Sequence, residues 1–322
     1  MRVLVTGRGS IAQRHARHLR FLRPDLVLAV ISGTGEVDAS LLPCTVFGNM
    51  QAALLWKPEA IVVASISSKH ADEIEICLRL GLPCLFEKPL VINSEQLALI
   101  KKASHQKSLS NALVVGCNLR YLPALQKLKR ALSGAVPCRV LRAHLEVGQA
   151  LSQWRPSRDL KTTYSVDAVS GGGVVFDLVH EIDMARWLLG PLQVHAAIGG
   201  HFSALPIQSD DVCTVLLKTA SGTPVVISLD YVSQQAVRKY TIVTDAGTFS
   251  MDIMDKCIVL HTDKNSRVVT DVAEDFDVPQ TYQSQIADWL MAIADYRHEV
   301  ASPFAAGLKT AELMLNIKQA AL

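Results

Sequence analysis

The first third of the chain alternates short apolar runs with stretches in which apolar residues recur at helical spacing. The helix-like stretches include residues 69–80 and 94–104. The apolar runs have the length of buried strands and span residues 2–6, 26–31, 60–64, 83–86 and 112–116. Continuous apolar strands that alternate with helices are typical of parallel strands covered on both faces, with right-handed crossovers. The pattern therefore predicts an α/β fold with a doubly wound parallel sheet.

From about residue 138 the strand-like runs follow one another, and several alternate apolar with polar residues. Turn residues such as Ser221-Gly222 lie between them. The expected strands span residues 139–147, 194–199, 212–218, 224–231, 240–244, 248–252 and 258–261. The expected helices span residues 123–132, 176–189, 283–296 and 305–320. This order predicts an α+β domain with a large, open, mainly antiparallel sheet.

Length and composition sharpen this division. At ~150 residues per domain, 322 residues make about two domains. We place the boundary after the fifth parallel strand, which gives domains 1–118 and 119–322. A chain that is 49% hydrophobic and 19% charged is not a disordered protein. A net charge of +2 and 6% aromatic residues disfavour nucleic-acid binding. No apolar run approaches the ~20 residues that span a membrane.

The seven cysteines are scattered and form no Cys-x-x-Cys pair. We expect them to be reduced thiols rather than disulfides or zinc ligands, so no metal site is predicted. The chain also becomes glycine-rich at Gly7, too early for the apolar core of a secretory signal. These features predict a cytoplasmic protein.

A glycine-rich loop, Gly7-Arg-Gly9-Ser10-Ile11-Ala12, follows the first strand and opens a helix. Gly7 permits a sharp turn, and Gly9 lets the backbone approach a pyrophosphate at the helix N-terminus. In this context the loop predicts dinucleotide binding by Gly7, Gly9, Ser10 and Ile11. The alternatives are a structural turn or a different phosphate ligand.

The second strand ends without the acidic residue that would bind the ribose of NAD. Ser32 and Thr34 stand there instead and are able to donate hydrogen bonds to a phosphate. These residues therefore favour NADP as the cofactor, and NAD remains the alternative. Arg8 or Arg14 would supply positive charge, although either is equally explained as a solvated side chain.

Lys88 lies in Phe86-Glu87-Lys88-Pro89, directly after the fourth predicted strand. Ligands of doubly wound sheets bind at the carboxyl ends of the strands, so Lys88 is expected to face the cofactor crevice. A lysine there holds a substrate hydroxyl and stabilises negative charge on its oxygen. The alternative is an ordinary surface lysine.

Three glycines, residues 171–173, precede a second candidate group: Asp177, His180 and Glu181. Their i, i+3, i+4 spacing predicts one shared face of a helix. A histidine held by a carboxylate is a general acid or base near neutral pH. The alternative is a polar helix face with a capping aspartate. Two metal-type ligands without a third do not predict a metal site.

Taken together, these segments resemble the Gfo/Idh/MocA oxidoreductase family, which includes glucose–fructose oxidoreductase and inositol dehydrogenase. The resemblance covers nearly the whole chain. It rests on residues 7–15, 67–70, 87–89, 118–121 and 171–180. It implies a Rossmann domain followed by a domain with a large open sheet. It also implies reversible NAD(P)-dependent oxidation of a secondary alcohol on a sugar, cyclitol or sugar derivative, in which Lys88 and His180 act on the hydroxyl and Asp177 is their carboxylate neighbour.

The resemblance further implies cofactor contacts by Ser65, His70, Glu87 and Lys88, and substrate contacts by Arg120, Trp154, Tyr164 and Glu181. The aromatic residues among them are equally explained as packing residues. Many members have one more residue between the aspartate and the histidine, which leaves open whether Asp177 or Glu181 orients His180.

The pattern most resembles members from nonulosonic acid and other surface-glycan pathways. It implies a homodimer or homotetramer formed through the second sheet. Two other functions remain open on the same fold: a non-catalytic NADP-binding sensor and an imine- or biliverdin-type reductase.

Overall fold

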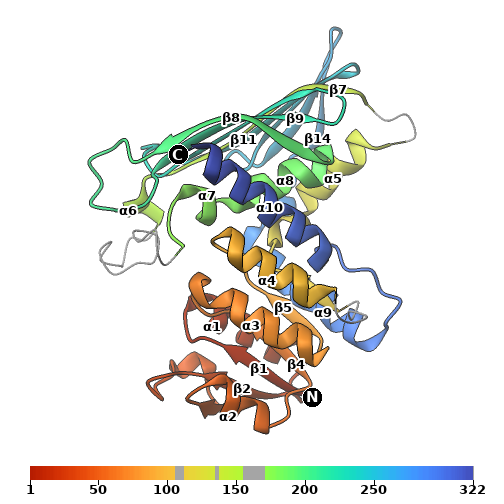
Figure 1. The fold of residues 1–322 in the computed structure, drawn as a ribbon. Helices are drawn as coiled ribbons and strands as arrows, with labels where there is room; N and C mark the ends of the chain where they lie inside the picture. The colour runs from red at the N-terminus through yellow and green to blue at the C-terminus, as the bar shows by residue number, and fades with distance from the viewer. Residues whose placement is uncertain (106–111, 135–137, 155–170, 322) are drawn as a thin grey trace. The chain divides into compact units, whose positions relative to one another are not determined.

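The computed structural model describes residues 1–105, 112–134, 138–154 and 171–321 and divides into two compact units (Figure 1). The first unit comprises Met1–Tyr121 and Pro279–Ala311. The second comprises Leu122–Val278 and Glu312–Leu322. The boundary expected at residue 118 lies close to the end of the first segment. Residues 279–311 then return to the first unit, although we predicted that they belong to the second domain.

The first unit contains a six-stranded parallel sheet in the order β3-β2-β1-β4-β5-β6, which confirms the predicted doubly wound sheet. Its strands are β1 (Arg2–Thr6), β2 (Val27–Ile31), β3 (Thr45–Phe47), β4 (Ala60–Val63), β5 (Cys84–Phe86) and β6 (Leu113–Val115). The edge strand β3 was not expected. It has three residues, none of them buried, so its sequence carries no strand pattern.

The helices of this unit are α1 (Ser10–Leu22), α2 (Met50–Leu55), α3 (Ser67–Leu80), α4 (Ser94–Ser104) and most of α9 (Val278–Ala294). Short 3-10 helices lie at Ala39–Leu41 and Asn118–Tyr121. Local signals fix several of their ends. Asn93 accepts a hydrogen bond from the Gln96 backbone at the start of α4. Gly81 ends α3 in the left-handed conformation.

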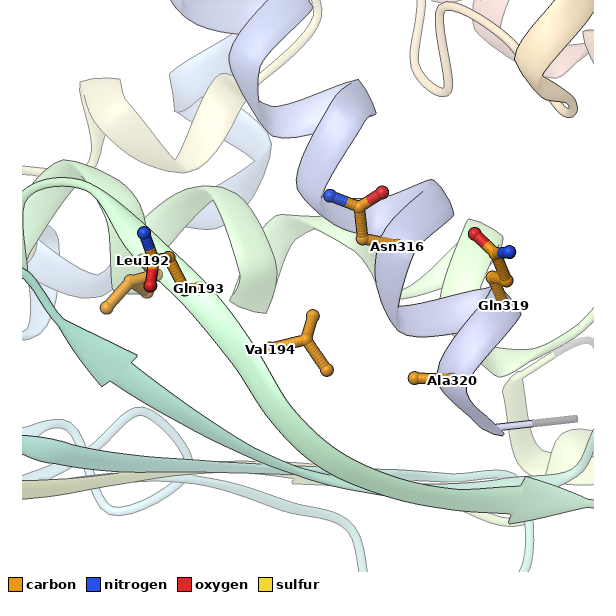
Figure 2. A pocket seen from close by; sticks show the side chains of 6 residues that line it. All are labelled: Leu192, Gln193, Val194, Asn316, Gln319 and Ala320. Carbon is orange, nitrogen blue, oxygen red and sulfur yellow. The ribbon is translucent and has the colours of Figure 1, made fainter.

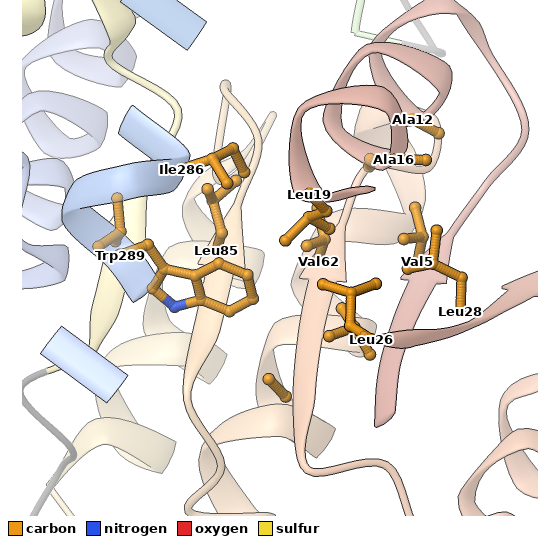
Figure 3. Packing of buried hydrophobic residues seen from close by; sticks show 14 of the residues in the cluster. Val5, Ala12, Ala16, Leu19, Leu26, Leu28, Val62, Leu85, Ile286 and Trp289 are labelled. Carbon is orange, nitrogen blue, oxygen red and sulfur yellow. The ribbon is translucent and has the colours of Figure 1, made fainter. Parts of the chain in front are cut away.

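Side chains from the sheet, α1 and α9 form one hydrophobic core (Figure 3). Val62 and Leu85 pack in it with Leu19 of α1 and Trp289 of α9. The Trp289 ring is fully buried, and its Nε1 donates to the Ala112 carbonyl at 3.0 Å. Because this core is incomplete without Trp289, residues 279–311 belong structurally to the first unit.

The second unit contains an eight-stranded sheet in the order β14-β13-β12-β11-β7-β10-β9-β8. Its neighbouring strands are antiparallel except for β7 and β10, which confirms the expected mainly antiparallel sheet. Its strands are β7 (Val140–Gly148), β8 (Leu192–Gly200), β9 (Val212–Thr219), β10 (Pro224–Asp230), β11 (Val237–Thr244), β12 (Gly247–Asp252), β13 (Cys257–His261) and β14 (Ser266–Thr270). The edge strand β14, mostly exposed, was not expected.

The helices of the second unit are α5 (Pro123–Leu132), α6 (Leu151–Trp154), α7 (Val174–Asp177), α8 (Val179–Leu189) and the C-terminal part of α10 (Phe304–Ala321). A 3-10 helix spans Ala273–Phe276. Along β10, buried residues alternate with half-buried ones, so one face of the sheet carries the core.

The single helix expected over residues 176–189 is two helices, α7 and α8. They are separated at Leu178, whose φ of −98° and ψ of 24° lie outside helical values. Asp177 ends α7, and His180 lies in the first turn of α8. The prediction that Asp177, His180 and Glu181 share one helix face is therefore wrong, because the helix breaks between the aspartate and the histidine.

Within the described ranges, no helix combines the length and the apolar character that crossing a membrane requires. All seven cysteines are free thiols.

Candidate active site

The glycine loop after β1 has two glycines in different environments. Gly7 has a φ of +83°, and a Cβ there would lie 2.6 Å from the Ala64 carbonyl oxygen, so only glycine fits. Gly9 has an extended φ of −70°, and a Cβ there would meet nothing within 4 Å. The space beside Gly9 is therefore free of described protein atoms.

The N-terminus of α1 suits a pyrophosphate. Gly9 is its N-cap, no described side chain caps it, and its first turn holds no acidic residue. The amides of Ser10 and Ile11 are thus available to an anion, whose charge the helix dipole favours. The residues present fit a dinucleotide cofactor, and the contacts expected of Gly7, Gly9, Ser10 and Ile11 stay a prediction.

The Arg8 side chain contacts Thr34, which lies after β2 where an NAD-binding domain commonly has an acidic residue. Its Nη1 donates to Thr34 Oγ1 at 2.8 Å, and the side chain is partly exposed. Ser32 is buried, and its hydroxyl donates to the Glu36 carbonyl at 2.6 Å. Arg14, the other candidate cation, lies over the Tyr282 ring at 4.3 Å from its centroid. Arg8 is therefore the arginine at this strand end.

His70 connects the loops after β4 and β5. Its ring nitrogens lie 2.8 Å from the Pro89 carbonyl and 3.0 Å from the Ser65 carbonyl. The Ser65 hydroxyl donates to Glu73 at 2.8 Å. Both loops begin at the carboxyl edge of the sheet, so this bridge supports the backbone at Pro89, next to Lys88.

Glu87 is buried and faces inward. Its Oε1 lies 2.6 Å from Nε2 of His15, and a Cβ on Gly116 would lie 2.8 Å from its carboxylate. Burial acts to raise the pKa of Glu87, but the hydrogen bond from His15 and the positive charge of Lys88 outweigh it, so the pKa lies below its usual value. The pair fixes the loop that carries Lys88, a role for His15 that sequence reasoning missed.

Arg120 is buried in the 3-10 helix Asn118–Tyr121, and its Nη1 donates to the Ala301 carbonyl at 3.2 Å. This contact joins the two chain segments of the first unit. The substrate contact expected of Arg120 stays a prediction.

In the second unit, Asp177 has a partner that the sequence did not suggest. Tyr231, buried directly after β10, donates its hydroxyl to Asp177 Oδ2 at 2.6 Å. The only sequence signal for this contact is a tyrosine at the end of the expected strand at residues 224–231. The carboxylate of Asp177 is thereby held in one orientation.

Glu181 serves a different contact. It is fully buried, and its Oε1 accepts hydrogen bonds from Arg238 Nε at 2.6 Å and from Tyr240 at 3.1 Å. Burial alone would lower the pKa of Arg238, but the Glu181 charge outweighs it and raises that pKa. Glu181 thus holds α8 on β11, with its Oε1 turned toward the sheet.

A clamp of remote residues fixes the start of α7. The Asp210 carbonyl accepts from the Val174 amide at 3.1 Å, and its Oδ2 accepts from the Val175 amide at 3.2 Å. Lys318 of α10 forms an ion pair with Asp210. Gly173 has a φ of +110°, and a Cβ there would lie 2.1 Å from Asp210 Oδ1. Sequence reasoning missed Asp210 and Lys318, because neither lies near the glycines in the chain.

Two predicted substrate residues cannot be placed. Tyr164 lies outside the described residues, and so does the side chain of Trp154. A hollow of about 540 Å³ lies between β8 and the end of α10 (Figure 2). Its described lining consists of Leu192, Gln193, Val194, Asn316, Gln319 and Ala320. None of these side chains titrates, so this hollow offers no proton-transfer group.

Comparisons with known proteins agree with this architecture. Residues 1–117 match the oxidoreductase family with an NAD-binding Rossmann fold, and residues 126–250 match the Gfo/Idh/MocA C-terminal domain. The fold and the cofactor loop thus define an NAD-binding oxidoreductase. The chain belongs to the Gfo/Idh/MocA family, as its motifs indicated.

Two curated relatives illustrate the range. UDP-N-acetylglucosamine 3-dehydrogenase of Acidithiobacillus ferrooxidans is 24% identical over 306 residues, 92% of this chain and 90% of that protein. Inositol 2-dehydrogenase of Rhizobium meliloti is 31% identical over 232 residues, 69% of this chain and 66% of that protein.

Solved structures share the fold. The same Acidithiobacillus ferrooxidans enzyme gives a TM-score of 0.79 at 22% identity, covering 99% of this chain and 97% of that one. A levoglucosan dehydrogenase in complex with NADH gives 0.83 at 18% identity, covering 100% and 96%.

Proposed function

We propose that this oxidoreductase transfers a hydride between a nicotinamide cofactor and a secondary alcohol carbon of a sugar, cyclitol or sugar derivative. The observation that carries the proposal is the shared sheet edge of the first unit. Strands β1, β4 and β5 are parallel neighbours, so the glycine loop after β1 and Lys88 after β5 lie at the same carboxyl edge. Relatives named for UDP-N-acetylglucosamine and inositol support the substrate class.

In the proposed mechanism, the family resemblance assigns both Lys88 and His180 to the substrate hydroxyl. A nicotinamide cofactor held at the glycine loop of Gly7 and Gly9 would supply the hydride acceptor for the carbon of the alcohol. His180 takes the hydroxyl proton, and the Lys88 ammonium stabilises the charge that develops on the oxygen. Asp177, oriented by Tyr231, stabilises the protonated imidazole. We assign this role to Asp177 rather than Glu181, because the Oε1 of Glu181 is bound to Arg238 and Tyr240.

The test is a screen of the purified protein with NAD and NADP separately against inositols, free sugars and nucleotide sugars. We expect a substrate-dependent absorbance of reduced nicotinamide with at least one polyol. Tight cofactor binding with no turnover on any of these polyols would support a non-catalytic sensor instead.

We further propose that NADP is the preferred cofactor. Arg8 and Thr34 at the end of β2 would bind its 2′-phosphate. Replacing Arg8 with Ala is expected to weaken NADPH binding about tenfold while leaving NADH binding nearly unchanged. Fluorescence titration measures both affinities. If Arg8→Ala weakens the binding of NADPH and NADH equally, Arg8 does not bind the 2′-phosphate.

We propose a homodimer or homotetramer formed through the large sheet, in the cytoplasm. Exposed aliphatic side chains on the two edge strands, Ile198 on β8 and Val268 on β14, are available to such an interface. Seven free thiols are consistent with a reducing compartment. Light scattering that gives the mass of one chain would contradict the oligomer.

A further inference from the structure

One carboxylate of the first unit accepts hydrogen bonds from two hydroxyl groups at the carboxyl edge of the parallel sheet. Oε2 of Glu73, on α3, accepts from Thr6 Oγ1 at 2.6 Å and from Ser65 Oγ at 2.8 Å. Thr6 ends β1, and Ser65 follows β4, its neighbour in the sheet. The strand order reverses between β1 and β4, and doubly wound sheets bind their ligands at this switch point. Glu73 therefore links the two strand ends where a ligand is expected.

The two hydroxyl groups lie in different environments. Thr6 is fully buried, and its Oγ1 also accepts from the Ala64 amide at 3.1 Å, so it is a structural link between β1 and β4. Ser65 is only half-buried, and its carbonyl lies 3.0 Å from Nε2 of His70. Its backbone and its side chain are thus both held in place. Of the two residues, Ser65 is the one that a ligand is able to contact.

The hydrogen bond to Glu73 determines what Ser65 offers to a ligand. A serine hydroxyl has one hydrogen and two lone pairs. Ser65 directs its hydrogen to Glu73 at 2.8 Å, whereas the Ile66 carbonyl lies farther away, at 3.4 Å. The oxygen therefore accepts from a ligand and does not donate to it. A phosphate oxygen, which only accepts, does not fit beside this carboxylate, but a hydroxyl or an amide N–H does.

The strand order indicates which part of a dinucleotide would meet Ser65. Because β4 lies between β1 and β5, Ser65 lies between the glycine loop after β1 and Lys88 after β5. The pyrophosphate is expected at the N-terminus of α1, and the reacting carbon is expected beside Lys88. The part of the cofactor between these two points is the ribose and carboxamide of its nicotinamide half. Both of these groups carry hydrogen-bond donors.

We propose that Glu73 is a positioning residue, which holds Ser65 as a hydrogen-bond acceptor for the nicotinamide half of the cofactor. The proposal rests on the proposed function, since it requires a bound nicotinamide cofactor. Glu73 itself acts only through Ser65. The donor is a ribose hydroxyl or the carboxamide N–H, and the experiment distinguishes the two.

The test measures the binding of three ligands by calorimetry: NADH, ADP-ribose, which lacks the nicotinamide, and ADP, which also lacks its ribose. Their 2′-phosphorylated forms are used instead if NADPH binds more tightly than NADH. Glu73→Met removes the acceptor, and we expect it to weaken NADH about three- to tenfold while leaving ADP unchanged. Ser65→Ala should have the same effect, and the double variant should lose no more than either single variant.

Three further variants separate positioning from a structural role. Glu73→Gln retains an oxygen that accepts from both hydroxyl groups, so it should recover most of the NADH affinity. Thr6→Val should lower the unfolding temperature and leave the ratio of NADH to ADP affinity unchanged, because buried Thr6 does not contact a ligand. Asp72→Asn is the matched control, since Asp72 is an exposed carboxylate at the neighbouring position of α3, and it should change neither property.

A loss of affinity for both NADH and ADP-ribose identifies a ribose hydroxyl as the donor, and a loss for NADH alone identifies the carboxamide. Either result supports the proposal. Equal weakening of NADH and ADP in Glu73→Met, or additive losses in the double variant, would show that Glu73 only supports the sheet edge and would overturn it. Polyol turnover with unchanged affinity ratios removes this inference alone, whereas a wild-type protein that binds neither NADH nor NADPH removes the proposed function as well.

Discussion

Lys88 and Asp177 are held in different ways by the two units. Lys88 follows β5 directly, and its loop is fixed by the buried His15–Glu87 pair and the bridge from His70. Asp177 ends a four-residue helix whose start depends on Asp210 and Lys318, and its carboxylate depends on Tyr231. The sheet edge of the first unit places Lys88, whereas the second unit places Asp177 by side chains from segments far away in the sequence.

This difference has a consequence for mutational sensitivity. In the first unit, a ligand-facing residue is replaceable without disturbing the sheet that places it. In the second unit, the residues that place Asp177 also pack and pair within the unit. Changes there are expected to affect stability and activity together, and the following substitutions separate the two cases.

Lys88→Met and His180→Gln should have the largest effects. Each removes a group proposed to act on the substrate oxygen, so kcat should fall about 100- to 10,000-fold. Thermal stability and cofactor affinity should change little for His180→Gln. Steady-state kinetics on the substrate found in the screen measure the loss. Turnover within about threefold of the wild type in both variants would contradict the assignment.

Gly173→Ala and Gly9→Ala compare the two glycine segments. At Gly173 the new Cβ meets Asp210 and the φ is positive, so we expect a loss of about 2–4 kcal/mol in unfolding free energy. At Gly9 the Cβ meets no protein atom, so stability should change by less than about 0.5 kcal/mol while cofactor affinity falls. Denaturant unfolding measures the stability of each variant, and fluorescence titration measures its cofactor affinity. Equal losses of unfolding free energy in the two variants would contradict the difference between the two glycine segments.

Tyr231→Phe and Lys318→Met test the supports of Asp177. Each leaves the proposed catalytic residues in place but removes a polar contact, so kcat should fall about tenfold. The pH profile of kcat should shift in Tyr231→Phe, because the Asp177 carboxylate then loses a hydrogen bond. Lys318→Arg, which keeps the charge, should recover most of the activity. An unchanged pH profile together with full activity would indicate a purely structural contact.

Among these variants Glu87→Gln is expected to change kcat least, and its loss of stability is complete at neutral pH. The pKa of Glu87 is lowered in the folded protein, so the folded state binds fewer protons than the unfolded state. Its contribution is complete above the unfolded pKa of about 4.3 and is lost as pH falls through the folded value. Glu87→Gln should therefore flatten the acid side of the stability curve. Parallel acid curves for both proteins would show that the carboxylate is not ionised in the fold.

Much of the first unit could be predicted from local sequence. Gly7, Gly9 and Lys88 follow strands directly, and their roles depend on neighbours in the chain. The return of Trp289 to this unit could not be predicted, because its core partners lie far away in sequence. In the second unit the pattern predicted the sheet but not the helix break at Leu178, the Asp210–Lys318 clamp or the partner of Glu181. These depend on tertiary contacts that hydrophobic periodicity does not encode.

The most direct measurement follows the hydrogen itself. A substrate carrying deuterium on the carbon of the oxidised alcohol is incubated with the enzyme and NADP or NAD, and the reduced cofactor is examined by mass spectrometry. Hydride transfer predicts that the deuterium appears in the reduced nicotinamide, and that Lys88→Met and His180→Gln slow its appearance. Reduced cofactor without deuterium, or deuterium released to water, would contradict the account.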